Sequence, residues 1–252
     1  MHLRYRLAMP LVALSLALAF APAMAAKPSH VPAPVNSSLP APSVVTGSSQ
    51  CTMGQTGASQ AFQWFFPSDD YYYTFIDPST CCPNGIDNLV AHWLLYWTAP
   101  CNINVQVWMV KAVPNGPGCF VPDAGNDPPD PTAAETLCGP TAVFPITGVG
   151  LVDHVIPLPP CACINEPAFV LWKIVNNIDC TVSGGSLDNP NIVVDGSPDP
   201  CVSYNGFLGG PPNEMPSSFG FPGNTSMYVD ADCCIVTKSL PSSWGKLKTL
   251  YR

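Results

Sequence analysis

Residues 87–113, DNLVAHWLLYWTAPCNINVQVWMVKAV, decide the fold class of this 252-residue chain. From Ile103 to Met109 an apolar residue occupies every second position, which is the period-two pattern of a strand with one buried face. The preceding segment 88–97 is mostly apolar on both faces, as in a strand that is covered on both sides. Between them, residues 98–102 have the composition of a tight reversal. We therefore expect a central hairpin of two antiparallel strands.

Further strands follow outward from this hairpin. Segments 61–66 and 71–77 read as a second hairpin closed by Pro-Ser-Asp-Asp at 67–70. Strands are also expected at 149–158, 168–176 and 191–195, and with weaker patterns at 141–146, 201–205 and 226–232. The segment between Asn205 and Thr225 is rich in Gly and Pro and is expected to be a loop. This spacing predicts an all-β protein, an antiparallel β-sandwich of jelly-roll type with about nine or ten strands.

Composition and charge narrow the class of protein. Charged residues are only 10% of the chain, hydrophobic residues are 47%, and there are 31 prolines, a combination that argues against both disorder and a helical fold. The net charge is −8, and it would be −10 after loss of Arg4 and Arg6. An acidic chain without basic clusters is a poor partner for nucleic acid or for an anionic membrane.

The chain divides into four expected regions. Residues 1–25 resemble a secretory signal peptide, with a basic start, an apolar stretch too short to span a bilayer, and Ala-Met-Ala at the cleavage point. The alternative is that this segment stays as a membrane anchor. Residues 26–50 read as a Pro/Ser-rich linker, 51–234 as the β-sandwich, and 235–252 as a C-terminal tail. We expect a secreted or cell-surface protein without stable membrane insertion once the signal is removed.

Twelve cysteines, an even number, all follow the signal segment, so we expect disulfides and no free thiols. One suggested bridge joins Cys119 to Cys138 across a loop, and the adjacent pairs Cys81-Cys82 and Cys233-Cys234 are expected to bridge to one another. A zinc site is the alternative, but no pair of cysteines has CxxC spacing. The expected disulfide cysteines are Cys51, Cys81, Cys82, Cys101, Cys119, Cys138, Cys161, Cys163, Cys180, Cys201, Cys233 and Cys234.

A long loop at 114–140 interrupts the strand pattern and is rich in Pro and Asp. Its oxygen-bearing side chains suggest calcium as a possible cofactor, although their spacing does not follow a known calcium loop. The alternative is an acidic, solvated surface loop. The candidate calcium ligands are Asp123, Asn126, Asp127 and Asp130. Two further segments, which begin at Asn36 and Asn224, match the acceptor pattern for N-glycosylation.

Catalytic signatures are absent from the sequence. It contains no G-x-S-x-G, H-E-x-x-H, G-x-x-x-x-G-K-[ST] or G-x-G-x-x-G motif. His92 and His154 lie within strand patterns, where a structural histidine is the commoner outcome. A Ser/His/Asp arrangement that uses His154 and Asp153 is one alternative, although no serine is singled out. A glycosidase pair that includes Glu135, Glu166 or Glu214 is another.

A binding face is the favoured hypothesis over catalysis. Pairing within the expected central hairpin would set polar and aromatic side chains beside one another, with a lysine from the strand at 168–176. Aromatic rings interleaved with Asn, Gln and His suit the stacking and hydrogen bonding of sugars. The alternative is that a second layer covers these rings and makes them core. The candidate ligand-binding residues are Trp108, Tyr96, His92, Gln106, Asn104 and Lys173.

The tail differs in character from the rest of the chain. Ser243 is positioned to cap a short helical turn with apolar residues on one side and basic residues around it. This pattern indicates a docking segment for a secretion or surface partner, with a frayed terminus as the alternative. The candidate docking residues are Trp244, Leu247, Leu250 and Tyr251.

The central stretch, the Pro/Asp loop, VLWKIV at 170–175 and NIVVDGSPDPC at 191–201 together resemble a family of secreted bacterial modules. These are jelly-roll β-sandwiches of the carbohydrate-binding or cell-surface accessory type. The resemblance spans about residues 61–232, implies the fold, and carries no functional residue across. We expect a non-catalytic extracellular or cell-surface protein that binds carbohydrate or a surface partner. The alternatives are a secreted hydrolase of polysaccharide or ester substrates and a self-associating structural subunit.

Overall fold

The computed structural model describes residues 34–36, 39, 51–64, 66–123, 130–180, 190–206 and 211–235. The expected signal peptide and the docking residues Trp244, Leu247, Leu250 and Tyr251 lie outside the described residues. None of the helices within the described ranges is long and apolar enough to cross a membrane. The expected linker contributes a short strand, β1 (Pro34–Asn36), which pairs with β3 (Gln60–Phe62) at the edge of a sheet.

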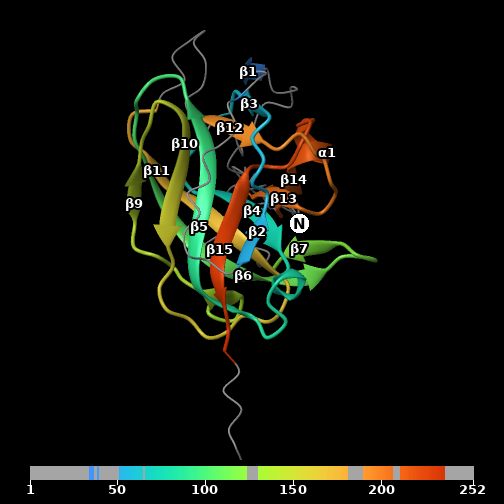
Figure 1. The fold of residues 1–252 in the computed structure, drawn as a ribbon. Coiled ribbons are helices and arrows are strands. Elements are labelled where there is room, and N and C mark those ends of the chain that lie inside the picture. Colours follow the sequence, from blue (N-terminus) through green and yellow to red (C-terminus); the bar gives the residue numbers. More distant parts are fainter. Residues whose placement is uncertain are drawn as a thin grey trace, which may run out of the picture.

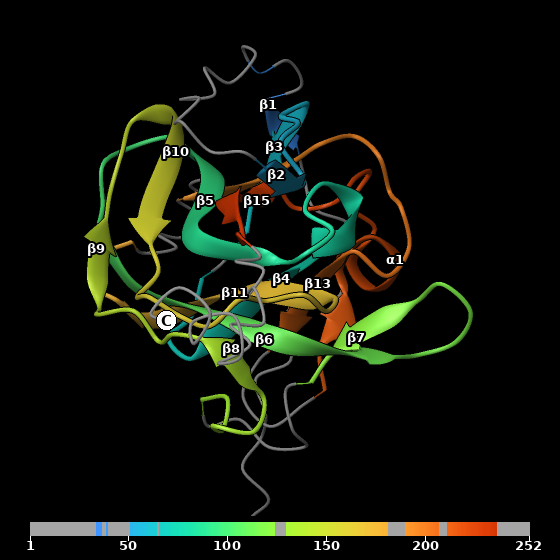
Figure 2. The same ribbon diagram turned by 60° about the horizontal axis from the view of Figure 1, so that its bottom comes forward.

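The sandwich consists of two antiparallel sheets, as predicted, and Figure 2 shows them as two facing layers. The chain passes repeatedly from one sheet to the other, as in a jelly roll, although some consecutive strands lie in the same sheet. The front sheet of Figure 1 has the central order β3, β12 (Asn191–Val194), β5 (Ile86–Trp97), β10 (Gly150–Pro157). The back sheet has the central order β4 (Asp70–Ile76), β11 (Ala168–Asn177), β6 (Ile103–Pro114), β9 (Phe144–Ile146).

Shorter elements extend both sheets. In the front sheet, β15 (Met227–Cys233) pairs with the first half of β5, and β2 (Cys51–Gly54) pairs with β15. In the back sheet, four short strands lie at the margins: β7 (Phe120–Pro122), β8 (Thr136–Cys138), β13 (Ser203–Gly206) and β14 (Asn213–Glu214). Among the described residues, the helical segments are the 3-10 turn η1 (Pro78–Thr80) and α1 (Met215–Phe219), and Gly220 ends α1 with a positive φ of 74°.

The expected central hairpin is wrong. β5 and β6 lie in different sheets, so residues 98–102 cross between the layers instead of joining paired neighbours. The expected hairpin of 61–66 with 71–77 is wrong in the same way, because β3 belongs to the front sheet and β4 to the back sheet. Two consecutive strands can be hydrogen-bonded neighbours in one sheet, or they can lie in opposite sheets with their apolar faces packed together. The alternation of apolar residues is the same in both cases.

The core lies between the inner faces of the two sheets. Trp93 of β5 and Trp172 of β11 meet there with ring centroids 5.5 Å apart, and Tyr72 of β4 packs on Trp93 at 4.9 Å. Each buried aromatic ring contributes up to about 4–6 kcal/mol through the area that it removes from water. This packing explains why the chain needs two apolar strands at 87–113.

Each sheet also carries apolar side chains on its outer face. On the back sheet, Tyr71, Trp108, Phe169 and Leu171 form a second cluster, against which Phe120 of the long loop packs. On the front sheet, Leu94, Val193 and Tyr228 form a third cluster with Ala61. Several outward-facing positions of β5, β6 and β11 are therefore buried, and Trp108 of the predicted binding face is among them.

All twelve cysteines form six disulfides, as expected, with no free cysteine. The suggested Cys119–Cys138 bridge is wrong. Cys138 lies in β8, which pairs with β6 at Met109 and Val110, whereas Cys119 precedes β7, which pairs with the end of β6 at 112–114. Of the expected links between adjacent pairs, Cys82–Cys233 forms, since β15 runs beside β5 and brings the two ends together. The full pairing is Cys51–Cys81, Cys82–Cys233, Cys101–Cys180, Cys119–Cys201, Cys138–Cys161 and Cys163–Cys234.

Candidate functional site

The predicted binding face does not exist as one surface. Trp108 lies on the outer face of the back sheet and is only 2% exposed, whereas His92 and Tyr96 point outward from the front sheet. Gln106 and Lys173 are paired neighbours on β6 and β11, as expected for an adjacent strand, and Asn104 lies further along β6. The error follows from the crossover, because the prediction required β5 and β6 to pair. The alternative interpretation, that a second layer covers Trp108, is correct.

Lys173 is the centre of a charged cluster on the back sheet. Its Nζ lies 2.6 Å from Oδ1 of Asp130 and 3.1 Å from Oδ1 of Asp69, and it sits 5.5 Å from the ring centre of Tyr71. Burial lowers the pKa of Lys173, but the hydrogen bonds that its ammonium group donates to Asp130 and Asp69 leave this pKa well above its ordinary value. This contact fastens Asp130, within the long Pro/Asp loop, to β11.

The calcium hypothesis concerns the same loop. Of its four candidate ligands, Asp123 and Asp130 are described, while Asn126 and Asp127 lie outside the described residues. Asp130 already binds the ammonium group of Lys173, so a calcium ion there would have to share this carboxylate with a cation. Calcium binding stays a prediction.

His154 and Asp153 point to opposite faces of β10, because they are consecutive residues of one strand. His154 faces the interior, where its Nε2 accepts a hydrogen bond from Nε1 of Trp97 at 2.9 Å. Burial lowers the pKa of His154 to about 4, against a smaller opposing effect of Asp153. The hypothetical Ser/His/Asp arrangement built on this pair is therefore not assembled.

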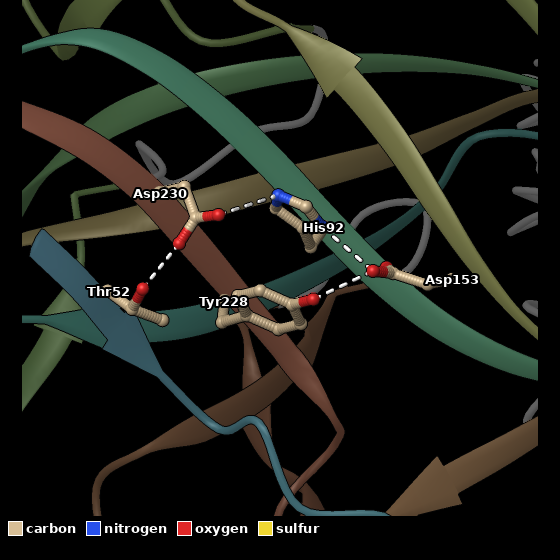
Figure 3. Close-up of polar contacts among 5 residues, drawn as sticks. All are labelled: Thr52, His92, Asp153, Tyr228 and Asp230. Carbon is tan, nitrogen blue, oxygen red and sulfur yellow. Dashed lines mark hydrogen bonds and ion pairs between the residues drawn. The ribbon is translucent and has the colours of Figure 1, made fainter. Parts of the chain in front are cut away.

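Asp153 instead meets His92, and Figure 3 shows the cluster of five side chains that results. His92 projects from β5, Asp153 from β10, Tyr228 and Asp230 from β15, and Thr52 from β2. Antiparallel pairing sets Tyr228 directly opposite His92. We call these five residues the His92 cluster.

The geometry of the His92 cluster is closed on itself. His92 Nδ1 lies 3.0 Å from Oδ2 of Asp153, and His92 Nε2 lies 3.5 Å from Oδ2 of Asp230. The Tyr228 hydroxyl donates to the same Asp153 oxygen at 2.7 Å, and the Thr52 hydroxyl donates to Asp230. The Tyr228 and His92 rings stack with centroids 4.2 Å apart and planes 11° from parallel.

Burial limits what the cluster can do chemically. The side chains of His92, Asp153 and Asp230 are 3%, 14% and 7% exposed. Burial, followed by the contacts with Asp153, raises the pKa of Tyr228 far above its ordinary value, so its hydroxyl stays protonated and donating. An imidazole between two carboxylates can hold a proton, but these exposures leave little room for a substrate at its nitrogens.

Sequence reasoning named His92 and Asp153 for other roles and missed Thr52, Tyr228 and Asp230. A polar His92 in an otherwise apolar strand was the available signal. Its partners lie at least 40 residues away along the chain, and only the sheet order brings them together.

Two groups of possible metal-ligating atoms occur among the described residues: Cys51, Cys81 and Cys82, and Cys101, Asp179 and Cys180. Every cysteine in them belongs to a disulfide, and a disulfide sulfur lacks the thiolate that binds a metal ion. Of the glutamates considered for a glycosidase pair, Glu135 accepts from the Thr132 amide within its own turn. Glu214 accepts from Cys201 and Ser217.

The second predicted glycosylation site, at Asn224, is also buried. Asn224 is fully buried, and its Nδ2 donates to the carbonyl oxygens of Ser197 and Asp199 at 2.7 and 3.1 Å. In the folded chain this nitrogen is therefore not accessible to modification.

The protein is therefore a disulfide-linked, antiparallel β-sandwich of jelly-roll type, and the ionisable side chains of its His92 cluster are largely buried. No protein-family model matches the chain, and no curated protein sequence and no solved structure is significantly similar to it. Six disulfides are typical of proteins that fold in an oxidising compartment.

Proposed function

We propose that this chain is a secreted, non-catalytic structural protein that associates with further copies of itself by strand addition along β10. Secretion is supported by the signal-like residues 1–25 and by the six disulfides. A non-catalytic role is supported by the burial of the His92 cluster. The observation that carries the proposal is the open edge of β10.

β10 is an eight-residue strand that pairs with β5 on one side and with no described strand on the other. Leu158 N donates to Leu89 O at 2.9 Å, which fixes the hydrogen-bonding alternation along the pair. The even-numbered residues of β10 therefore bond to β5. The N–H and C=O groups of Leu151, Asp153 and Val155 point away from the sheet, toward the open edge.

Apolar side chains accompany these outward backbone groups. Val155 is 47% exposed and lies on the outer face of β10 with Leu151, and Val149, just before the strand begins at Gly150, is 71% exposed. A second copy that pairs antiparallel can set Leu151 of one edge opposite Val155 of the other, which buries both. Pro157, which has no N–H, limits the pairing to the preceding residues.

An exposed, fairly long edge of this kind is what strand addition requires. Carbohydrate binding and hydrolysis, the other functions that the sequence suggests, have less support. Trp108, the intended stacking platform, is buried, and His154 is enclosed in the core.

The test measures the mass of the purified protein in solution by sedimentation velocity over a range of concentrations. Val155→Lys places a charge at the open edge, and Val155→Pro removes one outward N–H while sparing the hydrogen bonds to β5. The matched control is Ile178→Lys, because Ile178 is 56% exposed and lies outside β10. We expect the wild type and the control to self-associate and both Val155 variants to stay monomeric. A wild type that is monomeric at every concentration, or variants that associate like it, would reject the proposal.

A further inference from the structure

The His92 cluster joins three strands of the front sheet through one ring. His92 on β5 faces a carboxylate on each side, Asp153 on β10 and Asp230 on β15 (Figure 3). Among the described residues, His92 is the basic side chain that pairs with each of these two carboxylates. The edge strand β10 is thus connected to β15 by side chains as well as through the backbone of β5.

The hydrogen bonds of the cluster can be counted by donor and acceptor. Tyr228 donates to Oδ2 of Asp153, the oxygen nearest to His92, and Thr52 donates to Oδ1 of Asp230, whose Oδ2 faces His92. A neutral imidazole has one N–H, so one nitrogen would direct a lone pair at a carboxylate. An imidazolium has an N–H on each side, and imidazole is a stronger base than carboxylate.

We propose that His92 is held in the folded chain as an imidazolium that clamps β10 to β15, and that release of its proton loosens β10. The groups that face the ring are Asp153 from β10, Asp230 and Tyr228 from β15, and Thr52 from β2, while its outward neighbours on β5, Val90 and Leu94, are apolar. Without the proton, two largely buried carboxylates flank a neutral ring, and their mutual repulsion acts across the sheet. The clamp is a pH-sensitive device, and it does not depend on self-association.

Side-chain nitrogen NMR of the intact, disulfide-bonded protein reports the proton directly. We expect two N–H signals for His92 at about pH 6, the range in which histidines change charge. The variant Asp230→Asn removes one carboxylate and should lower the pH at which His92 loses its second proton by about one unit, a tenfold change in proton affinity. A single N–H signal under these conditions, or a proton found on Asp153 or Asp230 instead, would overturn the proposal.

The matched control is Asp232→Asn. Asp232 lies on the same strand, but its carboxylate accepts from the Asn88 amide and does not contact His92. This variant should leave the titration of His92 unchanged, and an equal shift in both variants would point to general charge and reject a specific clamp.

Hydrogen exchange supplies the second readout. When His92 loses its proton, the amides of Val152, His154 and Ile156 in β10 should exchange about tenfold faster, whereas the exchange rates of amides in β11 should stay the same. Uniform acceleration in both strands would contradict a local clamp. Because these measurements need only the monomer, failure of the Val155 experiment and failure of this one are distinguishable.

Discussion

Trp97 donates its indole N–H to Nε2 of His154 across 2.9 Å in the interior of the sandwich. A nitrogen that accepts this bond carries no proton, so the contact requires the neutral imidazole. The same surroundings lower the pKa of His154 to about 4 through burial. Folding is therefore coupled to the protonation of this histidine.

This coupling predicts a loss of stability in mild acid. The unfolded chain binds a proton at His154 below its ordinary pKa of about 6.5, whereas the folded chain resists it down to about 4. The contribution of His154 is therefore complete above about pH 6.5 and falls by about 3 kcal/mol as the pH drops to about 4. Urea unfolding of the oxidised protein at several pH values measures it. His154→Gln, which keeps an acceptor for Trp97, should remove this part of the pH dependence, and an unchanged slope would contradict the assignment.

Trp108 is predicted to be a core residue despite its outward position on β6. It packs with Tyr71, Phe169 and Leu171 beneath the long loop. Trp108→Ala should lower the free energy of unfolding by about 3–5 kcal/mol, with a smaller loss for Trp108→Phe. Chemical unfolding gives both values. A loss of glycan binding by Trp108→Ala at full stability would instead restore the carbohydrate hypothesis.

The Cys101–Cys180 disulfide is expected to stabilise the crossover from β5 to β6. It closes a separation of 79 residues and ties the crossover to the chain beyond the end of β11. Replacing both cysteines with alanine should cost about 2–5 kcal/mol, chiefly because the unfolded chain gains freedom. Peptide mapping under non-reducing conditions should first show the 101–180 link in the wild type. A different link would contradict the pairing itself.

Asn224 is predicted to stabilise the turn before β15. Its amide bridges two carbonyls of the 197–199 turn, and its backbone N–H donates to Asp195 at 2.9 Å. Asn224→Ala should cost about 1–3 kcal/mol by leaving those carbonyls unpaired. The matched control is Asn213→Ala, because Asn213 donates a single exposed bond to Pro211. Equal costs in thermal unfolding would show that the buried bridge has no special weight.

Alternation in β6 and β11, together with the spacing of apolar segments and turn residues elsewhere, was sufficient to predict most of the long strands and the sandwich class. Periodicity reports which residues face a core, and it does so without knowledge of the partner strand. It failed for the pairing of β5 with β6, and with that error the predicted binding face lost its basis. The His92 cluster could not be predicted either, since Thr52, Asp153 and Asp230 lie in strands that are distant along the chain.

By itself the sequence determined that the chain is all-β, that its cysteines are oxidised, and that large aromatic residues fill its core. These properties follow from local pattern and composition, which act residue by residue. Only the tertiary structure decided which strand lies beside which, which cysteines join, and that His92 meets two carboxylates. Those relations depend on contacts between distant segments, and the same alternating strand can satisfy its apolar face by pairing within a sheet or by packing across one.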